Sequence, residues 1–589
     1  MALTTEGVKV AELLNVIKQE GKAGAIVNLW STYDDQRAQK VADWQEVRNY
    51  IFATDTETTS NSDLPWKNST TLPKLCQIRD NLHSNYLSAL FPNDDWLRWE
   101  AYSSEDNSKR KANTIEAYIS NKAREGHMRT TMSKLLLDYI DYGISFATVD
   151  FFSEHKVMDN GDVVPGFTGP KVLRISPRDI VFNPLATSFA DSWKIVRSIK
   201  TEGEVKRLAR TNPEYSGLVN ALEERAAIAS KIGGYTSEDF EKADAYYVDG
   251  FGDLREYYQS GYIEFLEFYG DWHNLDTGEL ETDRVITIMD RRQVVRDEEI
   301  PSWLGKAPIY SVGWRTRPDN LWAMGPLDNL VGMQYRIDHL ENLKADAMDL
   351  CVHPPLKVIG EVEEFVWGPG VEIQIDENGD VSELGKNLNG IFAASNDIDK
   401  LEAKMEMYAG TPREAMGIRT PGEKTAFEVQ TLDNAAGRIF QEKITTFEIE
   451  LLEPVLNAML ESARRNLDGT DVVRTLDDDL AVKEFLEITR DDITASGILR
   501  PIGARHFSAK AQLLQNLSSV MNSGIAAKIA PHISSIALAK TVEDTLGLER
   551  YKLFVPNVAV MEQLETQRLA SQAQQILAEE QQAGIEEDV

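Results

Sequence analysis

Few residues of this chain have the types and spacings that catalytic or metal sites require. Asp376, Asn378 and Asp380 follow the spacing that opens an EF-hand calcium loop. However, Val381 stands where that loop needs glycine, and no matching glutamate closes it. A hairpin turn is the favoured interpretation of this stretch.

A second candidate is the pair Asp94-Asp95 beside Trp96 and Trp99, which could suggest carboxylates next to a sugar-binding aromatic platform. Adjacent aspartates are not a positioned acid–base pair, because the two carboxylates of a glycosidase lie on opposite sides of the scissile bond. We therefore expect a loop that packs its tryptophan rings inward.

The remaining catalytic patterns are missing from the sequence. There is no G-x-x-x-x-G-K-[ST] phosphate loop, no H-E-x-x-H zinc motif and no G-x-S-x-G nucleophile elbow. Gly368-Pro369-Gly370 resembles a phosphate loop only superficially, and His339 and His353 are expected to be structural or solvent-facing. We predict a protein that is not an enzyme and that needs no cofactor or metal.

Composition restricts the function further. The 589 residues include 95 acids and 62 bases, a formal charge of -33, which argues against a generic nucleic-acid binder and against adhesion to anionic membranes. Cys76 and Cys351 are the only cysteines, so a disulfide framework or zinc ribbon is not expected. With no secretory signal and no apolar run of about 18 residues, we expect a soluble protein made in a reducing cytosol.

Hydrophobic periodicity predicts an α+β chain that is mainly helical. Residues 72–90 and 111–142 have helical spacing, the latter as two helices joined near Gly126. From Gly143 the period changes to two, and an antiparallel region is expected over residues 262–296. Local hairpins mixed with helices favour α+β over a doubly wound sheet.

The second half has a distinctive order of elements. A near-heptad helix over residues 325–350 must end by Pro354-Pro355, and a second helix is expected over residues 396–409. A very long helix is predicted over residues 425–466, with a kink at Pro454. A small β-rich insertion is expected between the helices over residues 325–350 and 396–409. These two helices cannot bury every face alone, which favours a closed ring of identical copies.

This order resembles the portal protein, or head-to-tail connector, of tailed double-stranded DNA bacteriophages, most like those of short-tailed phages. The resemblance is carried by Gly325-Pro326-Leu327-Asp328-Asn329-Leu330, Leu340-Glu341-Asn342-Leu343, Thr420-Pro421-Gly422-Glu423-Lys424-Thr425-Ala426-Phe427-Glu428-Val429, Pro501-Ile502-Gly503-Ala504-Arg505-His506-Phe507, and Trp44 with Arg48-Asn49-Tyr50. It covers most of the chain in order and is strongest from about 320 to 510.

The resemblance implies a portal-type fold, assembled as a ring, usually of twelve subunits, at one capsid vertex. It divides the chain into an N-terminal wing (1–324), a first stem helix (325–350), a β-rich clip (351–395), a second stem helix (396–409), a tunnel loop (410–424), a long channel helix (425–466), a wing return (467–499), a helical crown (500–560) and an acidic tail (561–589), which we expect to be disordered.

The resemblance also implies roles for particular residues. DNA-contacting bases in the tunnel loop are Arg413, Arg419 and Lys424. Acidic candidates for the channel wall on the stem are Asp338, Glu341, Asp346 and Asp349. Clip residues facing the terminase or the adaptor are Lys357, Glu361, Glu363, Glu364 and Trp367. The loop is slightly basic in a very acidic chain, which suits weak, sequence-independent phosphate contacts beside a repulsive acidic wall.

The expected partners are further copies of the chain, the terminase large subunit, a tail adaptor, the major capsid and scaffolding proteins, and double-stranded DNA, with no membrane. The ring would nucleate head assembly in the host cytoplasm, admit DNA and release it through the tail from the virion's portal vertex. Two alternatives stay open: an acidic α+β enzyme acting on a polyanion or glycan, and another oligomeric adaptor or scaffold without a DNA channel.

Overall fold

The described part of the chain is mixed helix and strand, as the α+β prediction states. The computed structural model describes residues 21–52, 68, 70–91, 96–102, 109–157, 163–211, 215, 217–230, 261–273, 278, 280–300, 307–352, 356–360, 380–383, 388–410, 439–467, 470–476, 483–501 and 538. The chain forms two compact units, residues 1–471 with 488–501, and residues 472–487 with 502–589. Within the second unit, the described residues belong mainly to the paired strands β14 (Thr470–Leu476) and β15 (Lys483–Thr489).

Among the helices of the first half, those over residues 74–90 and 109–141 match their predicted positions. The helices of this half are a helix over residues 21–36, α2 (Ala38–Phe52), α3 (Lys74–Leu90), α4 (Lys109–Glu125), α5 (Met128–Asp141), α6 (Glu202–Thr211) and α7 (Leu218–Ser230). The apolar positions of α3 at three- and four-residue spacing, Leu75, Ile78, Leu82, Tyr86 and Leu90, are all buried. Gly126 and His127 separate α4 from α5, which confirms the predicted junction.

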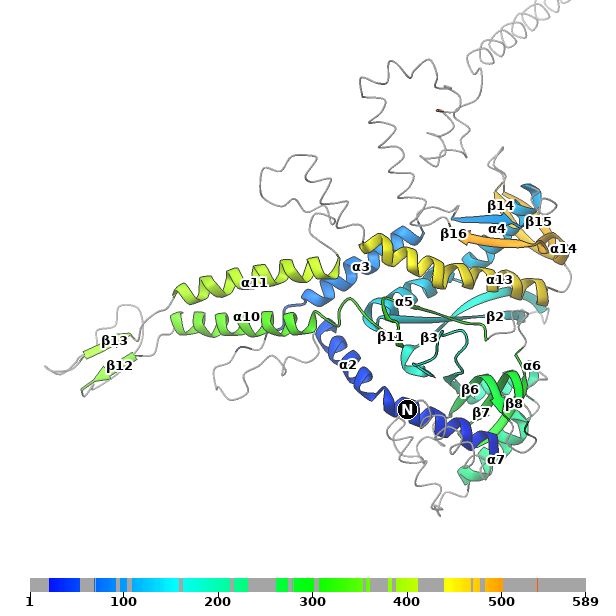
Figure 1. The fold of residues 1–589 in the computed structure, drawn as a ribbon, viewed down its shortest axis with the longest axis horizontal. Helices are drawn as coiled ribbons and strands as arrows, with labels where there is room; N and C mark the ends of the chain where they lie inside the picture. The colour runs from blue at the N-terminus through cyan, green and yellow to red at the C-terminus, as the bar shows by residue number, and fades with distance from the viewer. Residues whose placement is uncertain are drawn as a thin grey trace, which may run out of the picture. The chain divides into compact units, whose positions relative to one another are not determined.

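The two largest sheets that the structure describes in the first unit are both antiparallel (Figure 1). The five-stranded sheet has the order β4 (Ile180–Phe182), β5 (Lys194–Thr201), β6 (Tyr262–His273), β7 (Leu280–Met289) and β8 (Gln293–Glu299). The three-stranded sheet has the order β3 (Val163–Ile175), β2 (Ile144–Val157) and β9 (Ile309–Gly313). Trp30 and Ile26 of the first helix join a buried cluster with Leu266 and Ile286 of the larger sheet. The helix thus covers one face of that sheet with its apolar stripe.

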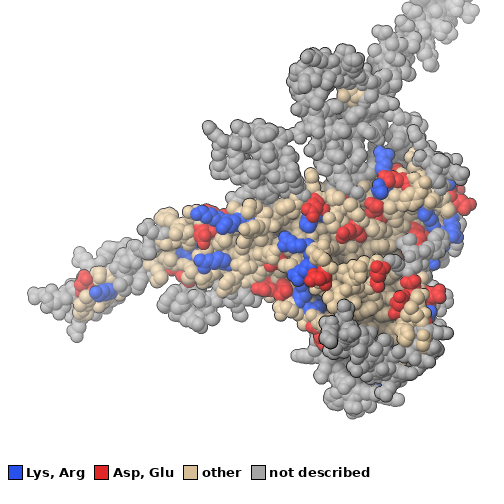
Figure 2. Space-filling view, viewed as in Figure 1, with Lys and Arg blue, Asp and Glu red and all other residues tan. Residues whose placement is uncertain are grey.

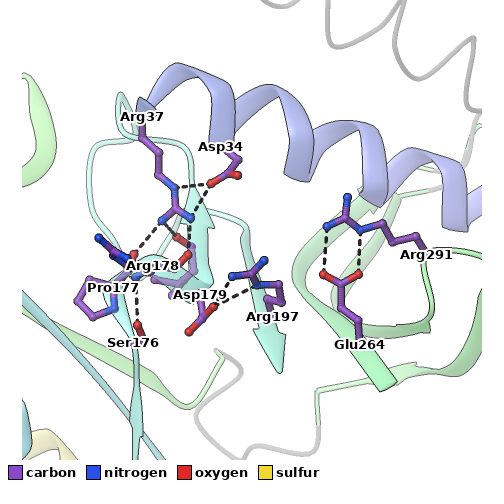
Figure 3. Close-up of polar contacts among 10 residues, drawn as sticks. Asp34, Arg37, Ser176, Pro177, Arg178, Asp179, Arg197, Glu264 and Arg291 are labelled. Atoms are coloured by element: carbon purple, nitrogen blue, oxygen red, sulfur yellow. Dashed lines mark hydrogen bonds and ion pairs between the residues drawn. The ribbon is translucent and has the colours of Figure 1, made fainter. Parts of the chain in front are cut away.

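Arg37, at the break between the first helix and α2, anchors these helices to the loop before β4. Its guanidinium is buried and donates hydrogen bonds to the carbonyl oxygens of Pro177 (2.8 Å), Arg178 (2.5 Å) and Ile180 (2.8 Å). Asp34 accepts a further bond from Nε at 2.8 Å. Figure 3 shows the side chain pointing from its helix into the loop. The planar guanidinium donates hydrogen bonds to three carbonyls and one carboxylate at once. It therefore fixes the angle between its helix and the sheet that contains β4.

One pairing joins distant parts of the first unit. Strand β1 (Leu97–Ala101) pairs antiparallel with β16 (Gly497–Pro501). Asn457, in the helix over Glu453–Asn466, holds β16 in place: its side chain donates to the Leu499 carbonyl at 3.0 Å and accepts from the Leu499 amide at 2.9 Å. The rings of Trp96 and Trp99 are buried, as predicted, but Trp99 lies on strand β1 rather than in the predicted loop.

A two-helix hairpin, which we call the stem, consists of α10 (Val331–Val352) and α11 (Leu388–Ala409) (Figure 1). Between them lies the antiparallel pair β12 (Leu356–Ile359) and β13 (Asp380–Glu383). The β insertion is therefore present, but α11 begins at Leu388 rather than at the predicted 396. The eight residues 388–395, placed in the clip by the prediction, are helical.

A long helix follows over residues 439–466 and ends in α13 (Glu453–Asn466). It contains a π-helical turn over Glu448–Leu452, directly before Pro454. A proline cannot donate its backbone bond, and a π turn is one way in which a helix accommodates that loss. The predicted start of this helix, residues 425–438, lies outside the described residues, and the kink stays a prediction.

The remaining described elements connect those above. They are η2 (Pro177–Asp179), β10 (Arg315–Arg317), β11 (Asn320–Met324) and α14 (Arg490–Ile493).

Candidate functional site

The stem is the candidate functional site because its surface is unlike that of a solvated hairpin. Large apolar side chains are exposed along its whole length: Tyr335, Leu343, Met348, Leu350 and Val352 on α10, Val358 and Ile359 on β12, and Phe392, Met407 and Tyr408 on α11. Phe392 is 71% exposed and Val352 67%. Exposed large apolar side chains in this number on one hairpin favour an interaction face.

The two stem helices carry 12 charged residues among their 44, the same 27% as the whole chain. In Figure 2 the visible face of α10 and α11 is mostly neither acidic nor basic, with small groups of both signs. Helix α10 carries Arg336 and Lys344 against four acids. Glu341 pairs with Lys344, so its charge is partly neutralised within the helix.

One face of α10 binds an extended segment that precedes α3. Residues 68 and 70–72, which we call the strap, run along this face. Asp346 accepts from the Asn68 amide at 2.8 Å, Asn342 accepts from the Thr70 amide at 2.8 Å, and Asp338 accepts from the Leu72 amide at 2.9 Å.

Two amide side chains of α10 complete the contact. Asn342 donates to the Thr70 carbonyl at 3.2 Å, and Gln334 donates to the Leu72 carbonyl at 2.6 Å. The side chains of α10 thus form hydrogen bonds with the backbone N–H and C=O groups of the strap, as a neighbouring strand would in a sheet.

The fit of strap to helix follows from two repeats. Gln334, Asp338, Asn342 and Asp346 are spaced by four residues, a rise of about 6 Å along an α-helix. Alternate residues of an extended chain are about 6.6 Å apart. Because the two repeats nearly match, each second strap residue meets the next polar side chain of α10.

The other stem helix is held at the same place by an ion pair. Lys74, the first residue of α3, donates to Glu406 of α11 at 2.5 Å, and both side chains are buried. Glu402 lies 3.4 Å from the same ammonium. The strap and the start of α3 therefore contact both stem helices.

This geometry corrects one predicted site residue and qualifies others. Asp338 is fully buried against the strap, so its carboxylate cannot line a channel. Desolvation by burial raises the pKa of Asp338 to about 6, which the hydrogen bonds from Leu72 and Gln334 oppose. Asp346 is half-buried and Asp349 is exposed, but both accept hydrogen bonds from Asn68 (2.8 and 3.0 Å).

Other predicted site residues are only partly placed. Lys357 is exposed on β12. The clip residues Glu361, Glu363, Glu364 and Trp367 and the tunnel-loop residues Arg413, Arg419 and Lys424 lie outside the described residues. Most of the predicted crown and the whole predicted tail also lie outside them.

The sequence reasoning missed the amides Gln334 and Asn342. A signal was available, because four polar residues recur every fourth position on a helix whose adjacent stripe is apolar. Buried polar side chains at such spacing indicate a hydrogen-bonded partner.

Within the described ranges, no group of three or more His, Cys, Asp or Glu residues could hold a metal ion. Among the helices that the structure describes, none combines the length and apolar character needed to cross a bilayer. No protein-family model matches the chain, and no curated protein is significantly similar to it.

Proposed function

We propose that this chain is a phage portal protein, the subunit of a ring that forms the DNA channel at one vertex of a capsid. The observation that carries the proposal is the stem, a helical hairpin whose exposed apolar side chains extend from Tyr408 at its base to Val352 and Phe392 near the β insertion. Each helix has 22 residues and is about 33 Å long. A hairpin of this length cannot cover its own outer faces, and identical neighbours in a closed ring can.

The anchoring of the stem supports the same proposal. A projecting hairpin that works within a ring must keep a fixed angle to its own wing, and the strap contacts and the Lys74–Glu406 pair supply that fixation. In this proposal the residues between the helices dock the terminase large subunit and later the tail adaptor. The loop with Arg413, Arg419 and Lys424 touches passing DNA, and the chain has no catalytic role.

Electron microscopy of the purified chain tests the proposal. Negative-stain images should show rings of one diameter, usually twelvefold, with a central hole near the width of duplex DNA. Mass photometry of the same sample should give a single high-mass species. A monomer or small globular dimer under all assembly conditions would contradict the proposal. A ring without a passage wide enough for duplex DNA would support the alternative of an oligomeric adaptor.

A further inference from the structure

A cavity in the first unit is lined by charged and aromatic residues that have no role in the proposed portal function. It has a volume of about 370 Å³. Its walls come from α2, α3, α5 and β3. These elements lie close together in Figure 1. The cavity is distinct from the stem surface and from the strap.

The carboxylates in this cavity are already engaged. Arg79 donates Nε and Nη2 to the two oxygens of Asp141, at 2.6 and 2.8 Å. Arg174 donates Nε and Nη2 to the two oxygens of Asp138, at 2.5 and 2.7 Å. These bidentate pairs hold both guanidinium planes in fixed orientations, because the fork geometry admits few alternatives.

Each guanidinium has further N–H groups that are not bonded to its partner carboxylate. Within the described residues, Nη1 of Arg174 makes no hydrogen bond, and the nearest acid to Nη1 of Arg79 is Asp80, at 3.5 Å. An oriented guanidinium with spare N–H groups is a ready donor to an oxyanion.

Two further bases line the cavity without a counter-charge. Arg48 of α2 and Lys134 of α5 are exposed and form no ion pair with any residue that the structure describes. With Arg79 and Arg174 they make four bases against Asp138 and Asp141. The cavity therefore has a formal excess of two positive charges in a chain whose total is -33.

Apolar and aromatic groups form the rest of the wall. Trp44 and Tyr142 meet edge to face with ring centroids 5.1 Å apart, and Phe52 lies 5.6 Å from the Arg79 guanidinium. The volume exceeds that of a bare oxyanion and leaves room for an organic body against these rings.

We propose that this cavity binds a small organic phosphomonoester. A phosphomonoester carries about 1.5 to 2 negative charges near neutral pH, which matches the excess of two, whereas a carboxylate or a backbone phosphodiester carries one. The phosphate group accepts hydrogen bonds from the spare donors of Arg79 and Arg174 and is neutralised by Arg48 and Lys134. The organic body packs on Phe52, whose ring is exposed.

Isothermal titration of the full chain with phenyl phosphate tests this site, with diphenyl phosphate and duplex DNA as the diester probes. We expect phenyl phosphate to bind at millimolar concentration or below and the diesters to bind much more weakly. The double variant R48Q/K134Q should lower the affinity about tenfold or more, because it removes two charge-assisted contacts. Both side chains are exposed, so the variant should fold, and its thermal unfolding curve checks that.

R129Q is the matched control, since Arg129 is an exposed base of the same helix α5 outside the cavity. It should leave phenyl phosphate affinity unchanged. Absence of phenyl phosphate binding by the wild-type chain would overturn the proposal. Equal weakening by R129Q and R48Q/K134Q, or equal binding of diphenyl phosphate, would also overturn it. None of these outcomes depends on whether the chain forms rings.

Discussion

At the scale of single residues, Asp338 is the most unusual side chain of the stem. Its Oδ1 accepts from both the Leu72 amide and the Gln334 side chain, while its Oδ2 is buried without a hydrogen-bond partner among the described atoms. Its pKa of about 6 is therefore a consequence of a desolvated negative charge.

The raised pKa gives a stability that depends on pH. The folded pKa lies above the unfolded value, so the folded state binds the proton more tightly and is favoured at low pH. This contribution is lost as the pH rises from about 4 through about 6, and the loss amounts to up to about 3 kcal/mol above that window. Asp338→Asn removes the charge and keeps an acceptor for Leu72. We expect the melting temperature of the variant to rise relative to wild type as the pH increases from about 4 to 7.

Asp349→Asn is the control for this series, because Asp349 is exposed and contacts the same strap residue Asn68 as Asp346. Its melting temperature should stay parallel to that of wild type. Parallel curves for Asp338→Asn as well would show that the buried carboxylate does not titrate in this window.

Arg37 allows a second prediction at this scale. Replacing it with methionine leaves the carbonyls of Pro177, Arg178 and Ile180 without their donor, and each buried carbonyl that loses its bond costs free energy. We expect Arg37→Met to lower the free energy of unfolding by about 3 kcal/mol or more. Arg37→Lys keeps the charge but not the fork, so its loss should be intermediate. Chemical denaturation of wild type, Arg37→Met and Arg37→Lys gives the order of their free energies of unfolding. If Arg37→Lys is as unstable as Arg37→Met, the charge alone does not stabilise this contact.

At the scale of elements, the junction of α3 with α11 depends on one buried pair. Removing Lys74 alone takes from the buried Glu406 carboxylate its ammonium partner at 2.5 Å, and breaking a buried pair in this way costs about 3–5 kcal/mol. We expect Lys74→Met to destabilise the chain by this amount and Lys74→Met/Glu406→Met to recover much of it. A double-mutant cycle measured by denaturation gives the coupling energy, and hydrogen exchange in α11 reports whether the stem loosens. Additive effects of the two substitutions would mean that the pair does not hold the junction.

Helices and strands were predicted correctly where the hydrophobic spacing within a single element indicates its buried face. The buried positions of α3 and the β6–β7–β8 meander follow from spacing alone. The start of α11 was wrong by eight residues, because the prediction placed residues 388–395 in the β insertion although they are helical in the structure. Asn389 and Gly390 have weak helix propensity, so propensity alone does not indicate this start.

At the scale of the whole molecule, the exposed stem side chains determine whether copies assemble. Phe392→Asp places a charge on a side chain that is 71% exposed, so the fold of one chain should be unaffected. In a ring the same charge would be buried against a neighbour without a partner, which is costly. We expect the variant to remain folded but to fail to form rings by size-exclusion chromatography and negative-stain microscopy.

Leu185→Asp is the matched control, because Leu185 is 58% exposed and lies outside the stem. It should assemble as wild type does. If both variants form rings, the stem is not the subunit interface, and if both fail, the effect comes from added charge rather than from position.

The sequence by itself determined the local features of this protein. Hydrophobic periods of about 3.6 and of 2 identified the helices and antiparallel strands, because each period reflects one buried face of one element. The missing catalytic and phosphate-loop motifs, together with the formal charge of -33, underlie the expectation of a non-enzymatic acidic chain.

Only the tertiary structure decided which distant residues meet. The pairing of β1 with β16, the strap on α10 and the four bases around the cavity of about 370 Å³ join residues that no local period relates. The structure also shows that Asp338, a candidate for the channel wall under the portal resemblance, is buried. The physical reason is that long-range contacts form wherever surfaces complement one another, and that complementarity depends on shape and on unpaired polar groups after folding.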